Sequence, residues 1–407
     1  MTSVYRARWI LPISRPPIRD GWVAIVNGRV VAVGDSNQSL PKPMVDLGDV
    51  AILPSLVNAH THLEFSHFDK PIGQPGVKLY DWVGEVVRAR NSLAVASCKD
   101  SASAIIEGLR QSFQAGVGLV GDIVTTPALT TSTTAIVGEL PPDVISMAEV
   151  LGLVASRSDQ KLALAIDHIE RLANRHSTQP GISPHAPYST PRHVVDRCVE
   201  IAIKNHLTLA MHVAESAEER DLIERGEGPF AAKLKEIQVY DPALFPWGKD
   251  ATRDLLVRLA QAPRALLIHG NDLRDDEIEL IARHRHVTVV YCPRTHCYFD
   301  QPPHPVDRLI AAGVRVAIGT DSRASNPDLS PWHEVQWLLA HRQDLPWQCV
   351  LDMATLSGAN AFARADLGRI EIGASAKLLV IPTAASTVDQ LPEALLGNEP
   401  NWLKPAA

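Results

Sequence analysis

Short apolar runs recur along most of the chain, and each is followed by polar residues and then by a segment with helical spacing. The runs occupy residues 51–58, 118–123, 144–150, 181–184, 207–211, 265–268, 287–291 and 314–318. Apolar residues recur every three or four positions in the segments between them, among others 102–113, 192–204, 252–261 and 275–284. Eight strands alternating with helices predict an α/β fold of the (β/α)₈ barrel type. An open doubly wound parallel sheet is the alternative.

The two ends of the chain carry strand patterns instead. Residues 21–26 and 29–33 are β-rich, and Asn27-Gly28 between them is a strong signal for a two-residue hairpin. Past the last predicted barrel helix, at 351–364, residues 377–381 read as one more strand, which no helix would follow and which would pair with the hairpin. We therefore expect a small β-sandwich domain built from residues 1–50 and 370–407, and a barrel formed by residues 51–369.

Histidine and aspartate stand at four of the eight predicted strand ends. The first run leads into His60 and His62, and the fifth into His212. His269 ends the sixth run, and Asp321 follows the eighth. Side chains two positions apart on a strand point to the same side, and functional residues of such barrels gather at the C-terminal strand ends. Imidazoles with one carboxylate are the ligands of a catalytic divalent metal site.

The alternative is coincidence, because the chain has sixteen histidines. A single histidine is more often a surface or core residue than a ligand, and the pair of His60 and His62 alone would be a short signal. Four histidines and one aspartate at four strand ends, in the order a barrel would bring together, favour a metal site over chance.

The sequence motifs around these residues narrow the range of possible functions. Residues 58–67 read Asn-Ala-His-Thr-His-Leu-Glu-Phe-Ser-His, residues 183–188 read Ser-Pro-His-Ala-Pro-Tyr, and residues 292–294 read Cys-Pro-Arg. With His212, Glu215, His269 and Asp321 they resemble the amidohydrolase superfamily, in its cytosine-deaminase and nucleoside-deaminase branch. The resemblance spans nearly the whole chain. It is closest to the aminodeoxyfutalosine deaminases and then to the S-adenosylhomocysteine/methylthioadenosine deaminases.

This resemblance implies one divalent ion, Zn²⁺ or else Fe²⁺, held by four side chains: His60, His62, His212 and Asp321. Such an ion lowers the pKa of a bound water, and Asp321 would take the water proton. His269 would hold the hydroxide by a hydrogen bond. Glu215 would protonate a purine ring nitrogen and then supply protons to the leaving ammonia. Binuclear relatives often carry a lysine at the end of the fourth strand. Residues 183–185 supply none, which favours one ion.

Four further residues are expected at the substrate: His185, Trp82, Glu149 and Arg294. Trp82 follows a long Pro- and Gly-containing segment that would cover a bound base, although it would serve equally as a helix anchor. For Glu149, binding of ribose or base and a solvated role are open alternatives. Arg294 stands at a family position, but Thr295-His296 after it departs from the usual Ser-Asn, and Arg323 departs from the Leu common after Thr-Asp-Ser. These departures leave the substrate open.

Composition excludes several other classes. The formal net charge of −7 argues against a nucleic-acid partner, and five scattered cysteines form no disulfide framework. No stretch reaches the roughly 18 apolar residues of a membrane helix, and the first 19 residues lack the apolar centre of a signal peptide. We expect a cytoplasmic protein with a small-molecule substrate, no membrane partner and a homodimer as its assembly. The charged segment 215–225 reads as a solvated helix face.

The expected activity is hydrolytic release of ammonia from the 6-amino group of an adenine-type nucleoside. Aminodeoxyfutalosine, in menaquinone synthesis, is the first candidate, and S-adenosylhomocysteine or methylthioadenosine is the second. Guanine deamination, triazine dechlorination and imidazolone ring opening use the same ligand set and stay open. A non-catalytic barrel scaffold would have lost at least one of the four ligands, and none is missing.

Overall fold

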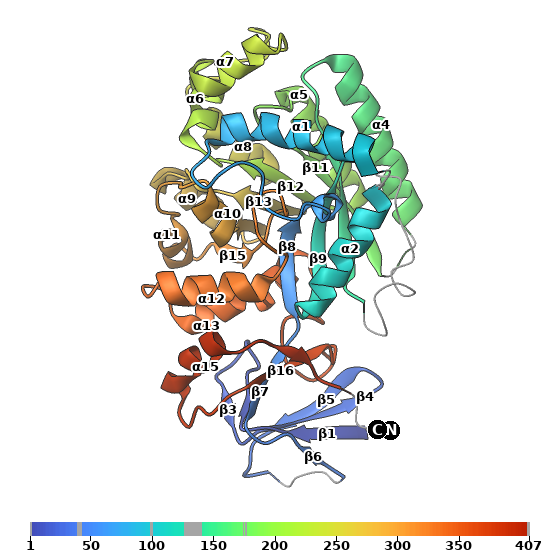
Figure 1. The fold of residues 1–407 in the computed structure, drawn as a ribbon, viewed down its shortest axis with the longest axis vertical. Helices are drawn as coiled ribbons and strands as arrows, with labels where there is room; N and C mark the ends of the chain where they lie inside the picture. The colour runs from blue at the N-terminus through green and yellow to red at the C-terminus, as the bar shows by residue number, and fades with distance from the viewer. Residues whose placement is uncertain are drawn as a thin grey trace.

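The computed structural model describes residues 2–38, 43–97, 101–125, 141–173, 175 and 177–404, with only the backbone for 91–97. Eight parallel strands form one sheet in chain order (Figure 1): β8 (Leu56–Thr61), β9 (Val117–Val124), β10 (Asp143–Val150), β11 (Thr178–Pro184), β12 (Thr208–Val213), β13 (Arg264–His269), β14 (Val287–Tyr291) and β15 (Arg315–Ile318). A parallel bridge between Thr61 and Asp321 joins the last strand to the first. The barrel prediction is confirmed, and the doubly wound sheet is excluded.

Helices surround these strands (Figure 1). They are α1 (Leu79–Ser97), α2 (Ser101–Gln114), α4 (Ala155–Leu172), α5 (Arg192–Asn205), α6 (Ala217–Arg225), α7 (Gly228–Glu236), α8 (Ala251–Leu259), α9 (Asp275–Ala282), α10 (Pro293–Tyr298), α11 (Val306–Ala311), α12 (Pro331–His341), α13 (Trp347–Met353), α14 (Leu356–Ala361) and α15 (Leu391–Gly397). The expected helices at 102–113, 192–204, 252–261 and 275–284 coincide with α2, α5, α8 and α9. The one expected at 351–364 is instead two short helices, because the backbone of Thr355 (φ −137°, ψ −89°) leaves the helical region.

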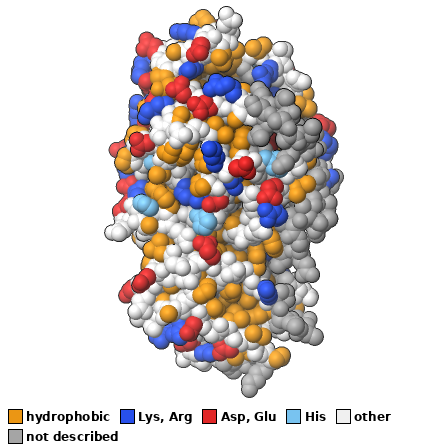
Figure 2. All heavy atoms as spheres, viewed as in Figure 1, with side chains coloured by type: hydrophobic (Ala, Val, Ile, Leu, Met, Phe, Trp, Pro, Cys, Tyr) orange, Lys and Arg blue, Asp and Glu red, His pale blue; other side chains and the backbone are white. Residues whose placement is uncertain are grey.

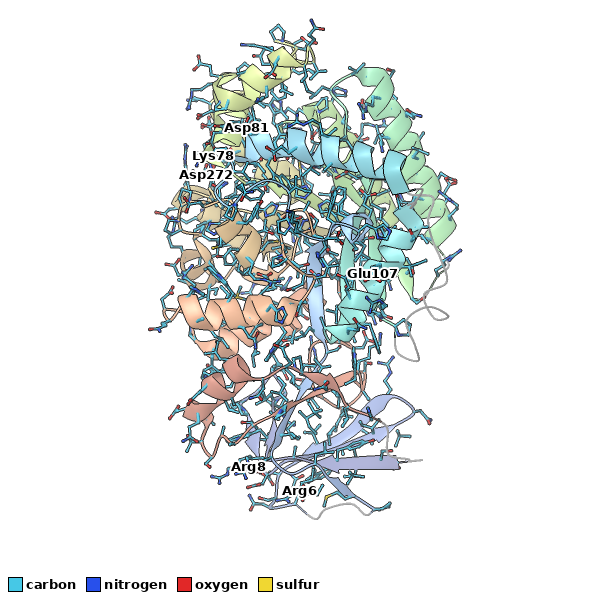
Figure 3. The ribbon with its side chains drawn as sticks, in the orientation of Figure 1. Arg6, Arg8, Lys78, Asp81, Glu107 and Asp272 are labelled. Carbon is cyan, nitrogen blue, oxygen red and sulfur yellow. The ribbon has the colours of Figure 1, made fainter. Side chains whose placement is uncertain are left out.

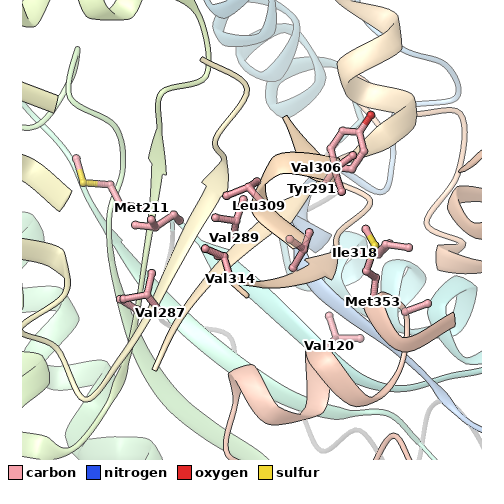
Figure 4. Close-up of a cluster of buried hydrophobic side chains, with 14 of the residues drawn as sticks. Val120, Met211, Val287, Val289, Tyr291, Val306, Leu309, Val314, Ile318 and Met353 are labelled. Carbon is pink, nitrogen blue, oxygen red and sulfur yellow. The ribbon is translucent and has the colours of Figure 1, made fainter. Parts of the chain in front are cut away.

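Apolar side chains fill the space between strands and helices. Figure 4 shows part of this core, where Val287 and Val289 of β14 lie near Leu309 of α11. A second cluster fills the barrel interior and includes Met147, Leu266 and Val290, all fully buried. Each fully buried side chain of this size stabilises the fold by about 1.5–3 kcal/mol. This packing makes the strand ends a rigid support for the polar residues that follow them.

Both chain ends form two mixed sheets at one end of the molecule (Figure 1). One has the order β5 (Arg29–Gly34), β4 (Trp22–Val26), β1 (Thr2–Arg6), β6 (Val45–Asp46). The other has the order β17 (Asn401–Trp402), β16 (Leu378–Pro382), β7 (Val50–Pro54), β2 (Trp9–Ile10), β3 (Ile18–Arg19). Asn27 and Gly28 adopt φ values of 49° and 71° between β4 and β5. That conformation is the two-residue hairpin turn expected there.

Two details of the sequence interpretation are wrong here. The run at 51–58 contains two strands, because β7 belongs to the small sheet and β8 begins the barrel. A continuous apolar run cannot show where a chain passes from one sheet to another, since both strands are buried. The strand near 377–381 is β16, which pairs with β7 and β17 instead of with the hairpin, and α15 follows it. The division of the chain at residues 50 and 370 stays a prediction.

The outer surface mixes apolar and charged side chains on the face shown in Figure 2. Arg6 and Arg8, both labelled in Figure 3, lie at the end of the molecule that holds the small sheets. Arg6 pairs with Asp46 at 2.7 Å, and exposed pairs of this kind contribute about 0–1 kcal/mol. In the part of the chain that the structure describes, no helix has the length and apolar character needed to cross a membrane.

Candidate active site

The C-terminal ends of β8, β12, β13 and β15 bring four histidines and an aspartate together. The Nε2 atoms of His60 and His62 lie 3.6 and 3.8 Å from Asp321 Oδ1. The Nε2 atoms of His62 and His212 are 3.3 Å apart. Ring nitrogens of His60, His212 and His269 all lie within 4.8 Å of one another. His60 is completely shielded from solvent, and the other four side chains are also buried.

The chemistry of this cluster fits a divalent cation. Neither ring nitrogen of His60 has a hydrogen-bond partner, and His62 Nδ1 has none either. Burial, and then the charge of neighbouring imidazoles, holds the pKa of both rings well below its ordinary value, so they are neutral. An unsatisfied buried polar atom costs about 1–3 kcal/mol. A cation bound by His60 Nε2, which lies 3.6 Å from Asp321 Oδ1, would remove that cost at this atom.

Hydrogen bonds fix how the ligand atoms point. His212 Nδ1 donates to the carbonyl oxygen of His185 at 2.8 Å, which leaves the lone pair of Nε2 directed into the cluster. Ser325 Oγ donates to Asp321 Oδ2 at 2.9 Å. The other oxygen of this carboxylate, Oδ1, therefore faces His60 and His62.

The backbone at three strand ends is strained. Ala214, His269 and Asp321 have φ values of 51°, 71° and 55°, in the left-handed region that side chains other than glycine rarely adopt. Ala214 is held there by its N–H, which donates to Glu219 Oε1 at 2.7 Å. Strain of this kind persists where the surrounding structure imposes it, and it is commonest at functional sites.

Gly319 lets the last strand approach the first one closely. A Cβ atom at this position would lie 2.9 Å from His60 Cβ and 3.0 Å from the His60 carbonyl oxygen. We expect Gly319→Ala to push His60 out of place and to weaken metal binding about 10–100-fold, the scale on which groups that support ligands act. Competition with a chromophoric chelator measures this affinity. Gly397→Ala is the matched control, because a Cβ there meets nothing within 4 Å. Equal affinities for the two variants would contradict the expectation.

Glu215 lies directly after the left-handed turn at Ala214. Its Oε1 is 3.5 Å from His269 Nε2. Burial raises the pKa of Glu215 well above its ordinary value, and the charges of Asp321 and Glu219 raise it further. The raised pKa favours the protonated carboxyl group, which can donate a proton to a group in front of it.

A cavity of about 430 Å³ opens above this cluster. His62, His212, Glu215, His269 and Asp321 all line it, and its walls are mostly apolar: Phe65, Leu79, Val83, Val86, Leu151, Leu153, Tyr188 and Leu234. The volume lies within the range of small-molecule sites. A flat, mostly apolar ligand with one reacting polar edge suits such a cavity.

Three of the four expected substrate residues line this cavity: Trp82, Glu149 and His185. His185 Nε2 lies 3.9 Å from Glu149 Oε1, and burial raises the pKa of Glu149. Trp82 also packs edge-on against Phe299, with ring centroids 5.0 Å apart. Trp82 thus packs against a neighbouring ring and also borders the cavity, and its contact with a substrate stays a prediction.

Arg294 departs from the expectation. It is not among the residues that line the cavity, and its guanidinium is bound by Asp328 and Glu334. The assignment of Arg294 to the substrate is therefore corrected. The segment 215–225 also needs correction, because Arg220 on α6 is buried and pairs with Glu277 at 2.7 Å. These partners lie 34 or more residues away in the sequence, where no local pattern shows them.

The sequence interpretation missed one group at the cavity wall. Thr125 Oγ1 donates to Glu64 Oε1 at 2.7 Å, and Arg90 Nη2 donates to Thr125 Oγ1 at 2.5 Å. Arg90 and Thr125 line the cavity. Glu64 is the single acidic residue of the motif at 58–67, which was the available signal. Its partners lie on α1 and directly after β9, and no local spacing connects them to it.

Comparison with known proteins supports this geometry. A model of the amidohydrolase family matches residues 51–398. An aminodeoxyfutalosine deaminase from Deinococcus radiodurans is 30% identical over 336 residues, covering 77% of this chain and 75% of that protein. A 5-methylthioadenosine/S-adenosylhomocysteine deaminase from Nitratidesulfovibrio vulgaris is 26% identical over 397 residues, covering 93% and 82%. The structure of Helicobacter pylori aminofutalosine deaminase in complex with methylthio-coformycin has a TM-score of 0.82 at 22% identity, over 98% of this chain and 97% of that one. The resemblance seen in the motifs is confirmed, and the chain belongs to the amidohydrolase family.

Proposed function

We propose that this amidohydrolase is a metal-dependent deaminase that hydrolyses the 6-amino group of an adenine-type nucleoside and releases ammonia. The observation that carries the proposal is the position of Glu215 beside the His–Asp cluster, where both line a largely apolar cavity and burial raises the pKa of Glu215. The names of the two relatives support the reaction class.

One divalent ion would be held by four side chains: His60, His62, His212 and Asp321. Imidazole nitrogens with a single carboxylate suit Zn²⁺ first and Fe²⁺ second. When bound, such an ion makes water a competent nucleophile near neutral pH. A lysine that would bridge a second ion is absent from the end of β11, which supports a single ion.

The protein's own groups then move the protons. The Asp321 carboxylate, oriented by the hydrogen bond from Ser325 to Oδ2, would accept a proton from the attacking water. His269 holds the attacking oxygen by a hydrogen bond. Glu215 donates its proton to a ring nitrogen next to the reacting carbon, so that the carbon accepts the new C–O bond. The Glu215 carboxylate then takes the proton of the new hydroxyl group and passes it to the amino group, so that the C–N bond breaks and ammonia leaves as the carbonyl forms. The proton held by Asp321 returns to Glu215 before the next cycle.

The substrate assigned first is aminodeoxyfutalosine, followed by S-adenosylhomocysteine and methylthioadenosine. His185 and Glu149 would contact the base or the sugar, and Trp82 would border the bound ring. An alternative reaction, hydrolysis at a ring carbon as in triazine or guanine hydrolases, would use the same residues at the base of the cavity. The cytoplasmic location and the homodimer stay predictions.

A substrate panel tests the proposal. We expect Zn²⁺-loaded protein to release ammonia from aminodeoxyfutalosine with the highest kcat/KM. The panel also includes S-adenosylhomocysteine, methylthioadenosine, adenosine, guanine, cytosine and atrazine, with elemental analysis of the purified protein. Activity on guanine, cytosine or atrazine alone would contradict an adenine-nucleoside deaminase. Inactivity of metal-loaded protein on the whole panel would contradict deamination altogether.

A further inference from the structure

Arg294 lies in a buried ionic assembly next to Asp321. Its Nε donates to Glu334 Oε1 at 2.8 Å, and its backbone N–H donates to Glu334 Oε2 at 2.9 Å. Its two terminal nitrogens donate to Asp328 at 3.0 and 2.6 Å. Glu334, on α12, is fully buried. A buried carboxylate requires such partners, because desolvation of an unpaired charge costs several kcal/mol.

Asn326 connects this assembly to the ligand loop. Its Nδ2 group donates to Glu334 Oε1 at 2.7 Å and to the carbonyl oxygen of Thr320 at 2.8 Å. Thr320 immediately precedes Asp321. On its other side, Asn58 of β8 donates from Nδ2 to Thr320 Oγ1 at 2.7 Å and accepts from Thr320 N at 3.1 Å. Thr320 is therefore held from two directions, at its carbonyl oxygen by Asn326 and at its N–H and hydroxyl group by Asn58.

A second connection reaches the Asp321 carboxylate itself. Thr295, next to Arg294, lies with its Oγ1 3.0 Å from Ser325 Oγ, which donates to Asp321 Oδ2. The left-handed backbone of Asp321 needs support of this kind, since strained conformations persist only where neighbouring groups impose them. Arg294, which stands at a family position, and Thr295, which departs from the family pattern, thus both connect to Asp321.

We propose that Glu334 is a positioning residue, which holds Asn326 and thereby aims Asp321 Oδ1 at His60 and His62. The inference rests on the proposed function in one respect, because it takes Asp321 as a metal ligand. All three partners of the Glu334 carboxylate are N–H donors. Glutamine has nearly the same shape but one oxygen and two N–H groups. In Glu334→Gln the side-chain NH₂ group would therefore face an N–H donor, and a hydrogen bond from either Asn326 or Arg294 would be lost.

The test measures the metal site without substrate. We expect Glu334→Gln to bind Zn²⁺ about 10–100-fold more weakly in chelator competition and to change the visible absorption of the Co²⁺-loaded protein. On the substrate found in the panel, kcat should fall while KM stays. Asn326→Ala breaks the same connection at its other end and should reproduce these changes. It carries the test by itself if Glu334→Gln does not fold.

Glu277→Gln is the matched control, because Glu277 is a buried carboxylate paired with an arginine in another part of the barrel. It should keep Zn²⁺ affinity and the Co²⁺ spectrum. Wild-type affinity and spectrum in Asn326→Ala would overturn the proposal, and so would an equal loss in Glu277→Gln. Failure of the wild-type protein to bind Zn²⁺ or Co²⁺ would instead overturn the proposed metal site.

Discussion

Replacement of Glu215 by glutamine is expected to slow ammonia release by at least ~10²-fold and to leave the metal content unchanged, because a positioned acid–base group contributes on that scale. Glutamine keeps the size of the side chain but cannot give up a proton to the ring nitrogen. The proposed ligands remain in place, since Glu215 contacts His269 at 3.5 Å and supplies no ligand atom. Initial rates under saturating substrate, with elemental analysis of the same samples, measure both quantities.

The control for this variant is Glu224→Gln on α6, the helix that begins two residues after Glu215. Glu224 pairs with Arg220 at 3.1 Å, and Arg220 also pairs with Asp272 and Glu277, so one lost partner leaves the arginine paired. Glu224 does not line the cavity, and its variant should turn over substrate like the wild type. Wild-type turnover by Glu215→Gln would show that another group shuttles the proton.

The position of the His–Asp cluster could be predicted because it depends on two local rules. The period of a strand places His60 and His62 on one side, and the barrel places strand ends at one rim. Neither rule needs knowledge of packing. The same reasoning failed for Arg294, whose role is set by carboxylates 34 and 40 residues later in the chain. The sequence motif is the same whether its arginine contacts a substrate or a buried carboxylate.

The boundaries between buried elements could not be predicted from the sequence, for a related reason. The run at 51–58 is apolar throughout because β7 and β8 are both buried, although they belong to different sheets. Likewise, the helical spacing at 351–364 continues through Thr355, where the backbone breaks the helix. Hydrophobic patterning reports burial, and it does not report which neighbour buries a residue. Tertiary structure supplied that information in both places.

His60→Ala should abolish metal binding and activity together. His60 belongs to both groups of side chains in the described chain whose ligand atoms lie within coordination reach of each other. Its loss should therefore weaken Zn²⁺ binding by more than the ~10–100-fold that supporting residues cause. Thermal unfolding measures this independently of turnover. Zn²⁺ at about 100 times its Kd stabilises a protein by about 2.7 kcal/mol, which should raise the Tm of the wild type and leave that of His60→Ala unchanged.

His168→Ala separates loss of a ligand from loss of any buried imidazole. His168 is buried on α4, with its Nε2 3.0 Å from Ser146 Oγ, and it belongs to neither metal group. Its variant should have a lower Tm without Zn²⁺ but the same rise in Tm when Zn²⁺ is added. If His60→Ala also gained stability from Zn²⁺ and kept its turnover, the remaining imidazoles would hold the ion without His60, and the four-ligand site would have to be reassigned around His212 and His269.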